Sequence, residues 1–476
     1  MPQFSFLRDS HVEPLAEGVF GVLEHVGVLC QNEEMLRALQ RRGAKADYAA
    51  ERATFPRKMV AQFVDGVRTE MSRAGEAERG GGEASFVAPG LPSVGGQVAQ
   101  FFYDYGRREK RSGNTQDLIY LTKLGDVLHG DSGVGHSLLL TDAPPLMEPL
   151  EAAMILAEYA HNPGRAFAWN VKLVDYLIEM GEILGIENWF SYGANCFAHP
   201  LRFDRDVADK FVRRVREGVA SGLTAMPVAG VTTPVTVEGF VVVSSAEHVA
   251  TWMAARALNP EVGLTGSMWP GTVDMRTGHV SYCCFDAMFY GFATVEFLRK
   301  WCGVNVRMGG GEYCDAKHPG LYAAYEKAYK AMTIAAFSGY HPGVGSGMLD
   351  EGKILAPVQL MLERDLGLGV RHFGRDIDPV AERIASPTIR DVGLGLERSY
   401  LETEHTLRNF RECLWLPELT DRSGWIGYDG EEKMLQKAHS KVESLLAEYE
   451  KPEGREDKLA AMRQVVERAR KHLLGQ

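Results

Sequence analysis

A turn between an apolar stretch and a helix-like stretch gathers several side chains that could do chemistry. Arg307 precedes three consecutive glycines, and four polar residues follow them: Glu312, Tyr313, Asp315 and Lys317. Asp315 and Lys317 have the side-chain types of an acid/base pair or of a clamp on a polar ligand. Arg307 can hold a carboxylate through two parallel hydrogen bonds. The alternative for Asp315 and Lys317, an ion pair on the surface at the start of a helix, stays open.

The three glycines, Gly309–Gly311, admit two interpretations. They could cradle a phosphate group at the N-terminus of the following helix. Their spacing, however, matches neither a Walker A loop nor the dinucleotide-binding fingerprint. We therefore favour the second interpretation, in which glycine lets the backbone bend and lets a ligand approach closely.

Large aromatic residues stand at or near the ends of the predicted strands. They are Trp169, Tyr192, Phe197, Trp269, Tyr313 and Tyr340. Rings of this kind can enclose a quaternary ammonium group through cation–π attraction, worth about 0.5–2 kcal/mol per ring. Packing in the core is the alternative for each single ring. His341 stands in a glycine-rich loop, and loops carry a large share of binding residues.

Alternating apolar patterns predict the elements that position these residues. From about residue 115, helix-like segments alternate with short apolar strand-like segments in about seven units of about 30 residues. Such alternation predicts an α/β fold with a parallel sheet, and this number of units favours a closed (β/α)8 TIM barrel. In TIM barrels the active site lies where the strands end, which is where the polar and aromatic residues named above are expected.

The same patterns predict three parts of the chain. Residues 1–114 are an N-terminal extension with helices over 14–78 and a glycine-rich loop over 79–96. Residues 115–394 form the barrel, with one of its helices expected near 285–302. Residues 395–476 are a C-terminal extension whose last two charged segments are helices packed outside the barrel.

Composition excludes several classes of protein. A formal net charge of -11 argues against binding nucleic acid or an anionic membrane surface. No stretch reaches the about 18 apolar residues of a membrane helix, and the first residues do not have the pattern of a secretory signal. The seven cysteines are scattered without a C-x-x-C pair, which predicts reduced thiols, a cytoplasmic location and no metal site.

Several segments, taken in order, resemble the trimethylamine methyltransferase family. Residues 225–249 carry its Met-Pro pair, its Gly-x-Thr-x-Pro-Val-Thr run and its Ala/Ser-Glu helix opening. Residues 271–278 resemble its Asp-Met-x-Thr-Gly turn, and 314–326 resemble its Asp-Ser/Ala-Lys segment. The His341 loop and residues 404–422 match its glycine-rich loop and its C-terminal His-Thr-Leu…Trp-x-Pro-x-Leu segment. The ordered set covers almost the whole chain.

The resemblance implies a (β/α)8 barrel that moves a methyl group from a methylated amine to the cobalt of a corrinoid (cobalamin) on a separate protein. No pyrrolysine is written in this sequence, so the chain resembles the branch that acts on quaternary amines such as glycine betaine. No tightly bound cofactor is then expected, and a homo-oligomer is expected. The implied catalytic residues are Asp315 and Lys317, at the mouth. The implied substrate-binding residues are Trp169, Tyr192, Trp269, Arg307, Glu312, Tyr313 and His341.

This sequence also departs from the family pattern. Gly320 and Tyr322 stand where the family has Asp and Gln, Cys314 replaces Thr, and Ala356 and Val358 replace a Ser-x-Glu pair. Two alternatives therefore stay open. One is a ligand-binding barrel that has lost catalysis, and the other is a barrel lyase that uses Lys317 as a Schiff-base amine.

Overall fold

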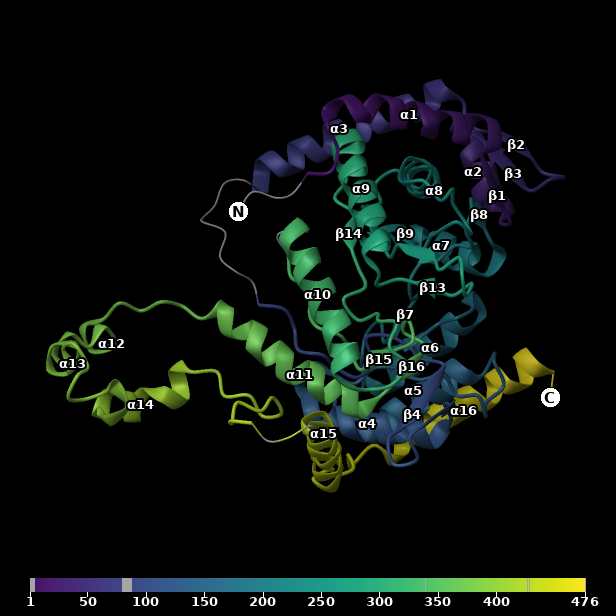
Figure 1. Ribbon diagram of the computed structural model, residues 1–476. Coiled ribbons are helices and arrows are strands. Elements are labelled where there is room, and N and C mark those ends of the chain that lie inside the picture. Colours follow the sequence, from purple (N-terminus) through teal and green to yellow (C-terminus); the bar gives the residue numbers. More distant parts are fainter. Residues whose placement is uncertain (1–4, 79–87, 339, 426, 428, 476) are drawn as a thin grey trace.

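The structure is a computed structural model that describes residues 5–78, 88–338, 340–425, 427 and 429–475, with the side chains of 74–78 left aside. Helices dominate it (Figure 1). In chain order they are α1 (Val12–Gly21), α2 (Glu33–Arg41), α3 (Arg57–Glu78), α4 (Thr115–His129), α5 (Glu148–Tyr159), α6 (Val174–Leu184), α7 (Arg205–Arg216), α8 (Val237–Leu258), α9 (Phe285–Cys302), α10 (Leu321–Ser338), α11 (Pro357–Arg371), α12 (Ala381–Ile384), α13 (Ser386–Val392), α14 (Glu404–Cys413), α15 (Gly430–Ala447) and α16 (Glu456–Leu474).

The strands are short. They are β1 (Val28–Cys30), β2 (Lys45–Asp47), β3 (Arg52–Thr54), β4 (Phe101–Asp104), β5 (Glu109–Ser112), β6 (Ala166–Phe167), β7 (Phe190–Ser191), β8 (Arg202–Phe203), β9 (Ser221–Ala225), β10 (Val228–Ala229), β11 (Leu264–Met268), β12 (Gly271–Val273), β13 (Val280–Ser281), β14 (Arg307–Met308), β15 (Met348–Leu349) and β16 (Ile354–Leu355). They form several small sheets, so the molecule has a mixed α/β fold.

Local sequence accounts for the helix ends. Asn114 and Asp117 form a reciprocal capping box at the start of α4, which satisfies backbone N–H groups that would otherwise lack partners. Helix α9 ends at Gly303, whose φ of 77° suits glycine. The observed bounds of α9 confirm the helix predicted at 285–302. The helical prediction for 14–78 is wrong in part, because β1, β2 and β3 lie there in a sheet of order β2-β3-β1-β8.

Parallel pairing joins strands that are separated by helices. Strand β11 lies between β9 and β14 and is parallel to both, with Ser267 opposite Thr224 on one side and Arg307 on the other. Strands β6 and β7 are parallel, as are β4 and β16. Because β4 lies before residue 115, the paired strands begin earlier in the chain than the sequence pattern predicts.

Three hydrophobic clusters hold the helices together. The first packs α1, α2 and α3 against α8 and α9. The second packs α15 against α4 and α11, and the third packs α16 against α5 and α6. The two helices predicted at the C-terminal end are therefore confirmed, and both are packed against the rest of the molecule. None of the described helices is long and apolar enough to cross a bilayer. All seven cysteines are free thiols.

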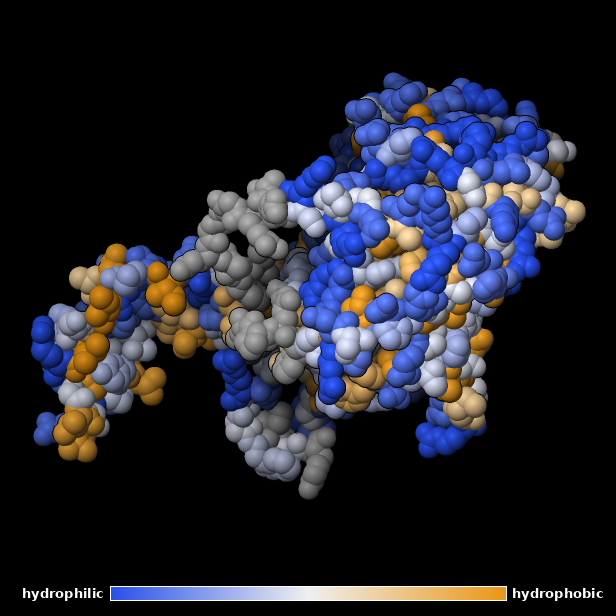
Figure 2. All heavy atoms as spheres, turned by 90° about the horizontal axis from the view of Figure 1, so that it is seen from above, coloured by the Kyte–Doolittle hydropathy of each residue, from blue (hydrophilic) through white to orange (hydrophobic). Residues whose placement is uncertain are grey.

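One segment departs from this packing. Residues 375–416, here called the arm, carry α12, α13 and α14 and lie apart from the rest of the molecule (Figure 1). Buried Asp365 on α11 fixes the end of the arm, since its carboxylate accepts hydrogen bonds from the backbone N–H groups of Glu418 and Thr420. Apolar atoms are gathered on the arm (Figure 2).

Candidate functional site

The three glycines after β14, Gly309–Gly311, are here called the glycine turn. They make room for Trp269, which follows β11. A Cβ atom on Gly309 would lie 2.3 Å from Cε2 of the indole, so only glycine fits there. Gly310 has a φ of 91°, and a Cβ atom on it would lie 2.9 Å from the Nζ atom of Lys330. The sequence analysis expects a ligand to approach these glycines closely. In the structure, the side chains of Trp269 and Lys330 lie there.

Trp269 belongs to a group of rings that we call the ring cluster: Trp269, Tyr282 and Tyr313. The Trp269 and Tyr313 centroids are 5.1 Å apart, and those of Tyr282 and Tyr313 are 5.9 Å apart. The Nζ atom of Lys330 lies 5.8 Å from the Tyr313 centroid and donates to the backbone oxygen of Tyr282. The ring cluster thus already faces the amine of a buried lysine, at a distance typical of cation–π contact.

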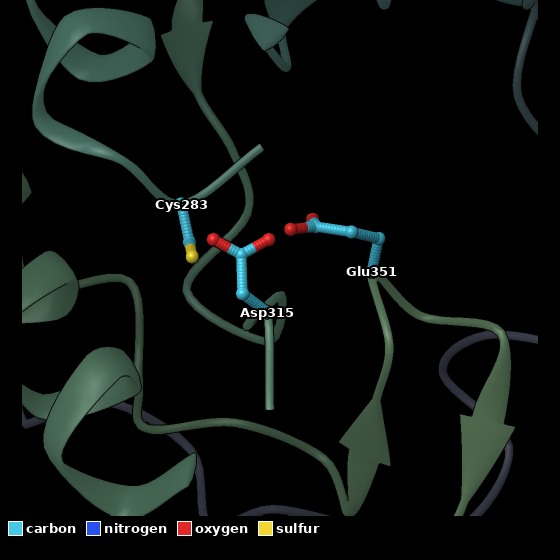
Figure 3. A group of neighbouring side chains, drawn as sticks. All are labelled: Cys283, Asp315 and Glu351. Atoms are coloured by element: carbon cyan, nitrogen blue, oxygen red, sulfur yellow. The ribbon is translucent and has the colours of Figure 1, made fainter. Parts of the chain in front are cut away.

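Beside the rings lies a group that we call the acid–thiol cluster: Cys283, Asp315 and Glu351. One ligand atom from each lies within 4.8 Å of the other two. The Glu351 carboxylate points toward that of Asp315, and the Cys283 thiol lies on the far side of Asp315 (Figure 3). Cys283 follows β13, Asp315 follows the glycine turn, and Glu351 lies in the tight turn between β15 and β16. Three separate turns therefore meet at this point.

Neighbouring groups hold two of the three members. Ser281 donates a hydrogen bond of 2.8 Å to Oδ2 of Asp315. The Cys283 thiol donates to Oε1 of buried Glu326 at 3.8 Å, and Glu326 itself accepts from the backbone N–H of Ala316. Glu351 differs, because its side chain is buried and neither of its carboxylate oxygens has a hydrogen-bond partner within the described chain.

Burial and like charge shift the protonation equilibria of this site. Burial, with the Asp315 carboxylate alongside, raises the pKa of Glu351 to about 9. Burial and the surrounding carboxylates also raise the pKa of the Cys283 thiol. Burial lowers the pKa of Lys330, while Glu351 and Cys283 oppose that shift. For Asp315, burial raises the pKa, but the hydrogen bond from Ser281 and the nearby Lys317 charge favour the ionised form, so the pKa is lowered.

A polar cavity of about 600 Å³ lies beside the sheet formed by β9, β11 and β14. Strands β9, β11 and β14 line it with Thr224, Ser267 and Arg307. The indole N–H of Trp269 donates to Oγ of Ser267 at 3.2 Å, which connects this cavity to the rings. Arg307 is exposed on its wall, so its guanidinium is free to bind an anionic group of a ligand.

The structure brings together three of the residues predicted from the sequence, Trp269, Tyr313 and Asp315, and it places Arg307 on the wall of the cavity. Glu312 follows the glycine turn but accepts a hydrogen bond of 2.5 Å from Gln97, and burial raises the pKa of its carboxyl. Lys317 lies at the rim, where it forms an ion pair of 2.7 Å with Asp350 and is half exposed.

The structure places three other predicted residues in different surroundings. Trp169 donates to Glu148 at 2.8 Å and stacks on Phe167. Tyr192 is buried and donates to Glu217 at 2.6 Å. His341 accepts through Nδ1 from the backbone N–H of Gly343, in a loop whose residue Pro342 lies against Gly311.

Sequence reasoning missed Tyr282, Cys283, Lys330 and Glu351. Cys283 is fully buried, and a single cysteine in the sequence gives no sign of the carboxylates that lie beside it. Lys330 follows Lys327 by three residues, so both lie on one face of α10, and this spacing is the signal that the sequence contains. Glu351 has a φ of 58°, a conformation that no local pattern in the sequence announces.

Comparison with known proteins adds a second line of observation. A family model described as trimethylamine methyltransferase (MTTB) matches residues 1–474. The chain is 21% identical over 468 residues to a glycine betaine methyltransferase of Desulfitobacterium hafniense, covering 95% of this chain and 94% of that protein. A trimethylamine methyltransferase of the same species is 21% identical over 484 residues, covering 96% and 92%. One of Methanosarcina barkeri is 25% identical over 283 residues, covering 59% and 56%.

Proposed function

The chain belongs to the trimethylamine methyltransferase family and is a methyltransferase; we propose that it moves a methyl group from a betaine-like quaternary amine to the Co(I) of a corrinoid on a partner protein. The likeness to a glycine betaine methyltransferase over almost the full length of both chains favours a betaine over a simple methylamine. A quaternary ammonium leaves as a neutral amine, so the reaction needs no proton donor. Binding and orientation are then the main tasks of the protein.

The observation that carries this proposal is the ring cluster beside the Asp315 carboxylate, with Trp269 hydrogen-bonded to Ser267, whose partner on the next strand is Arg307. Trp269 and Tyr313 offer ring faces and Asp315 offers a negative charge, which together suit a trimethylammonium group. Arg307 lies on the wall of the polar cavity and suits the carboxylate at the other end of a betaine. A zwitterion could thus be held at both ends, with Lys317 and Glu312 shaping the rim.

We propose that the strands form the (β/α)8 barrel expected from the sequence. Parallel contacts support it in succession: residue 99, just before β4, with residue 138, residue 134 with 163, and β6 with β7. The succession continues through the Thr224–Asn195 backbone hydrogen bond, then β9 with β11 and β11 with β14. Strand β16 returns to β4. This barrel starts at β4, so its domain boundary lies before residue 115.

An apolar surface beside Asp315 supports the proposal that a partner protein binds here. Phe285 on α9 and Leu321, Tyr322 and Tyr325 on α10 are large apolar side chains, each more than half exposed. A flat corrinoid presented by another protein could dock on such a surface, and the corrinoid would supply the nucleophilic cobalt. The seven free thiols are consistent with a cytoplasmic location.

We also propose that the protein is a homo-oligomer, joined through the arm. Its exposed apolar side chains have no cover in a single chain. Lys317 is a weaker candidate for a Schiff-base amine. Its burial opposes protonation, but the hydrogen bond and the charge of Asp350 raise its pKa, whereas such an amine needs a lowered one.

Methyl transfer from glycine betaine to free or protein-bound Co(I) corrinoid, followed by the change in corrinoid absorbance, tests the proposal. We expect turnover with a betaine, and we expect Arg307→Ala to weaken betaine binding while leaving tetramethylammonium binding unchanged. Tetramethylammonium lacks a carboxylate, so the contrast isolates the role of Arg307. Unchanged betaine affinity in Arg307→Ala would remove the proposed carboxylate contact.

A further inference from the structure

The acid–thiol cluster contains the donor atoms of a transition-metal site, and we propose that Cys283, Asp315 and Glu351 bind a zinc ion. In a tetrahedral zinc site, ligand atoms about 2.0–2.3 Å from the metal lie about 3.3–3.8 Å apart. The three atoms here already lie within 4.8 Å of one another. Small rotations of the side chains would therefore complete the site without moving the backbone.

Glu351 supplies an independent reason to place a cation here. Its side chain is 7% exposed, and neither carboxylate oxygen has a hydrogen-bond partner in the described chain. The carboxylate nevertheless points toward Asp315 (Figure 3). A buried carboxylate without a partner is costly, and two facing carboxylates repel each other when both are ionised. A divalent cation between them would compensate both effects.

The donor set selects zinc over calcium or magnesium. A cysteine thiolate is a soft ligand that zinc accepts, whereas calcium and magnesium prefer oxygen atoms only. Three protein ligands are also the number found in zinc sites that leave a fourth position open. That position would take a water molecule or a donor atom of a substrate.

The groups around the cluster fit this assignment. Ser281 orients Asp315, and residues of this kind hold metal ligands in place. The thiol proton that Cys283 donates to Glu326 would be released when the thiolate binds the metal. The buried Lys330 amine donates to the backbone oxygen of Tyr282, the residue before Cys283. A dication with one thiolate and two carboxylates carries a net charge of -1, which the Lys330 ammonium would balance. The site rests on these contacts alone and does not depend on the proposed methyl transfer.

The test is the metal content of the full-length protein after dialysis against zinc, together with the absorption spectrum of the cobalt(II) form. We expect about one zinc per chain and a thiolate-to-cobalt charge-transfer band, because one of the ligands is a sulfur atom. Protein that retains no stoichiometric zinc and shows no such band would overturn the proposal. Metal content is measured without substrate or corrinoid, so failure of methyl transfer would leave this result unaffected.

Variants assign the ligands. Cys283→Ser should remove the charge-transfer band and weaken zinc binding by at least about 100-fold, because even the groups that orient a ligand contribute about 10–100-fold. Glu351→Gln should weaken zinc binding similarly, and Ser281→Ala by about 10-fold. Circular dichroism of each variant checks that it is folded.

Cys284→Ser is the matched control. The Cys284 thiol is the next one in the chain but lies 3.0 Å from the Thr272 hydroxyl, outside the cluster. We expect this variant to keep both the band and the zinc. Loss of the band in Cys284→Ser but not in Cys283→Ser would contradict the assignment. Unchanged zinc binding in a folded Glu351→Gln variant would also contradict the assignment. The carboxylates would then be available to the ammonium group of the substrate.

Discussion

Burial of His248 without a hydrogen-bond partner makes the stability of this protein depend on pH. Both ring nitrogens of His248 lack partners within the described chain, and burial, with His199 nearby, lowers its pKa to about 3. The unfolded chain takes up a proton at about pH 6.5, whereas the folded protein does not until about pH 3. The stabilising effect is therefore complete above pH 6.5 and is lost as the pH falls below it.

We expect His248 to make the free energy of unfolding about 2 kcal/mol lower at pH 5 than at pH 7.5. In His248→Leu that part of the pH dependence should disappear, as measured by urea unfolding at the two pH values. Ser244→Ala is the control, because Ser244 is another buried, unpartnered side chain of α8 but does not titrate in this range. A His248→Leu profile parallel to that of the unsubstituted protein would contradict the argument.

At the scale of elements, the glycine turn sets the position of an indole. A methyl group on Gly309 would collide with Trp269, which must then move away from Tyr313. Since one ring contributes about 0.5–2 kcal/mol to binding a quaternary ammonium, Gly309→Ala should weaken betaine binding by about 2–30-fold. Titration calorimetry with betaine measures the change.

The control for this turn is Gly66→Ala, inside α3. No atom lies within 4 Å of a Cβ atom built on Gly66, and alanine suits a helix interior. This variant should keep its betaine affinity and gain about 0.5–1 kcal/mol of stability. Equal effects on affinity from the two substitutions would mean that the Gly309 result reflects stability and not the position of Trp269.

A buried ion pair joins α10 to α11 below the site. The Lys327 and Glu363 side chains are fully buried and form an ion pair, and Glu363 also accepts from the backbone N–H of Gly347. Removing one charge leaves the other uncompensated, so Lys327→Met should cost about 3–5 kcal/mol of unfolding free energy. Adding Glu363→Gln should recover part of this loss. A double variant no more stable than Lys327→Met would contradict the pairing.

Helix α9 could be predicted from the sequence, whereas the side-chain positions in the candidate site could not. Apolar periodicity and Gly303 define α9 locally, so its bounds could be predicted. The side chains of Trp169 and Tyr192 could not be placed, because the strands before them, β6 and β7, are two residues long and give no alternation from which to assign a face. Glu351 lies in the hairpin of β15 and β16, and that hairpin is placed by the pairing of β16 with β4, a contact between distant parts of the chain.

At the scale of the whole molecule, the arm is the feature that a single chain does not explain. Ile377, Leu394, Leu396 and Leu401 are between 85% and 93% exposed, although each is a large aliphatic side chain. Several of the orange patches of Figure 2 lie along this arm. A second copy of the chain is the partner we propose, because two identical arms can exchange symmetrically and cover each other's apolar surface.

The free energy gained by burying the arm's aliphatic side chains favours this assembly and suggests a test of it. Burial of four aliphatic side chains contributes about 6–12 kcal/mol, which is comparable with the about 4–15 kcal/mol lost on association. Replacing Leu394, Leu396 and Leu401 by serine should therefore dissociate the oligomer, as seen by light scattering during gel filtration. Val26→Ser, at an exposed apolar residue outside the arm, should leave the mass unchanged. A triple variant that keeps the mass of the unsubstituted protein would show that the arm does not join the copies.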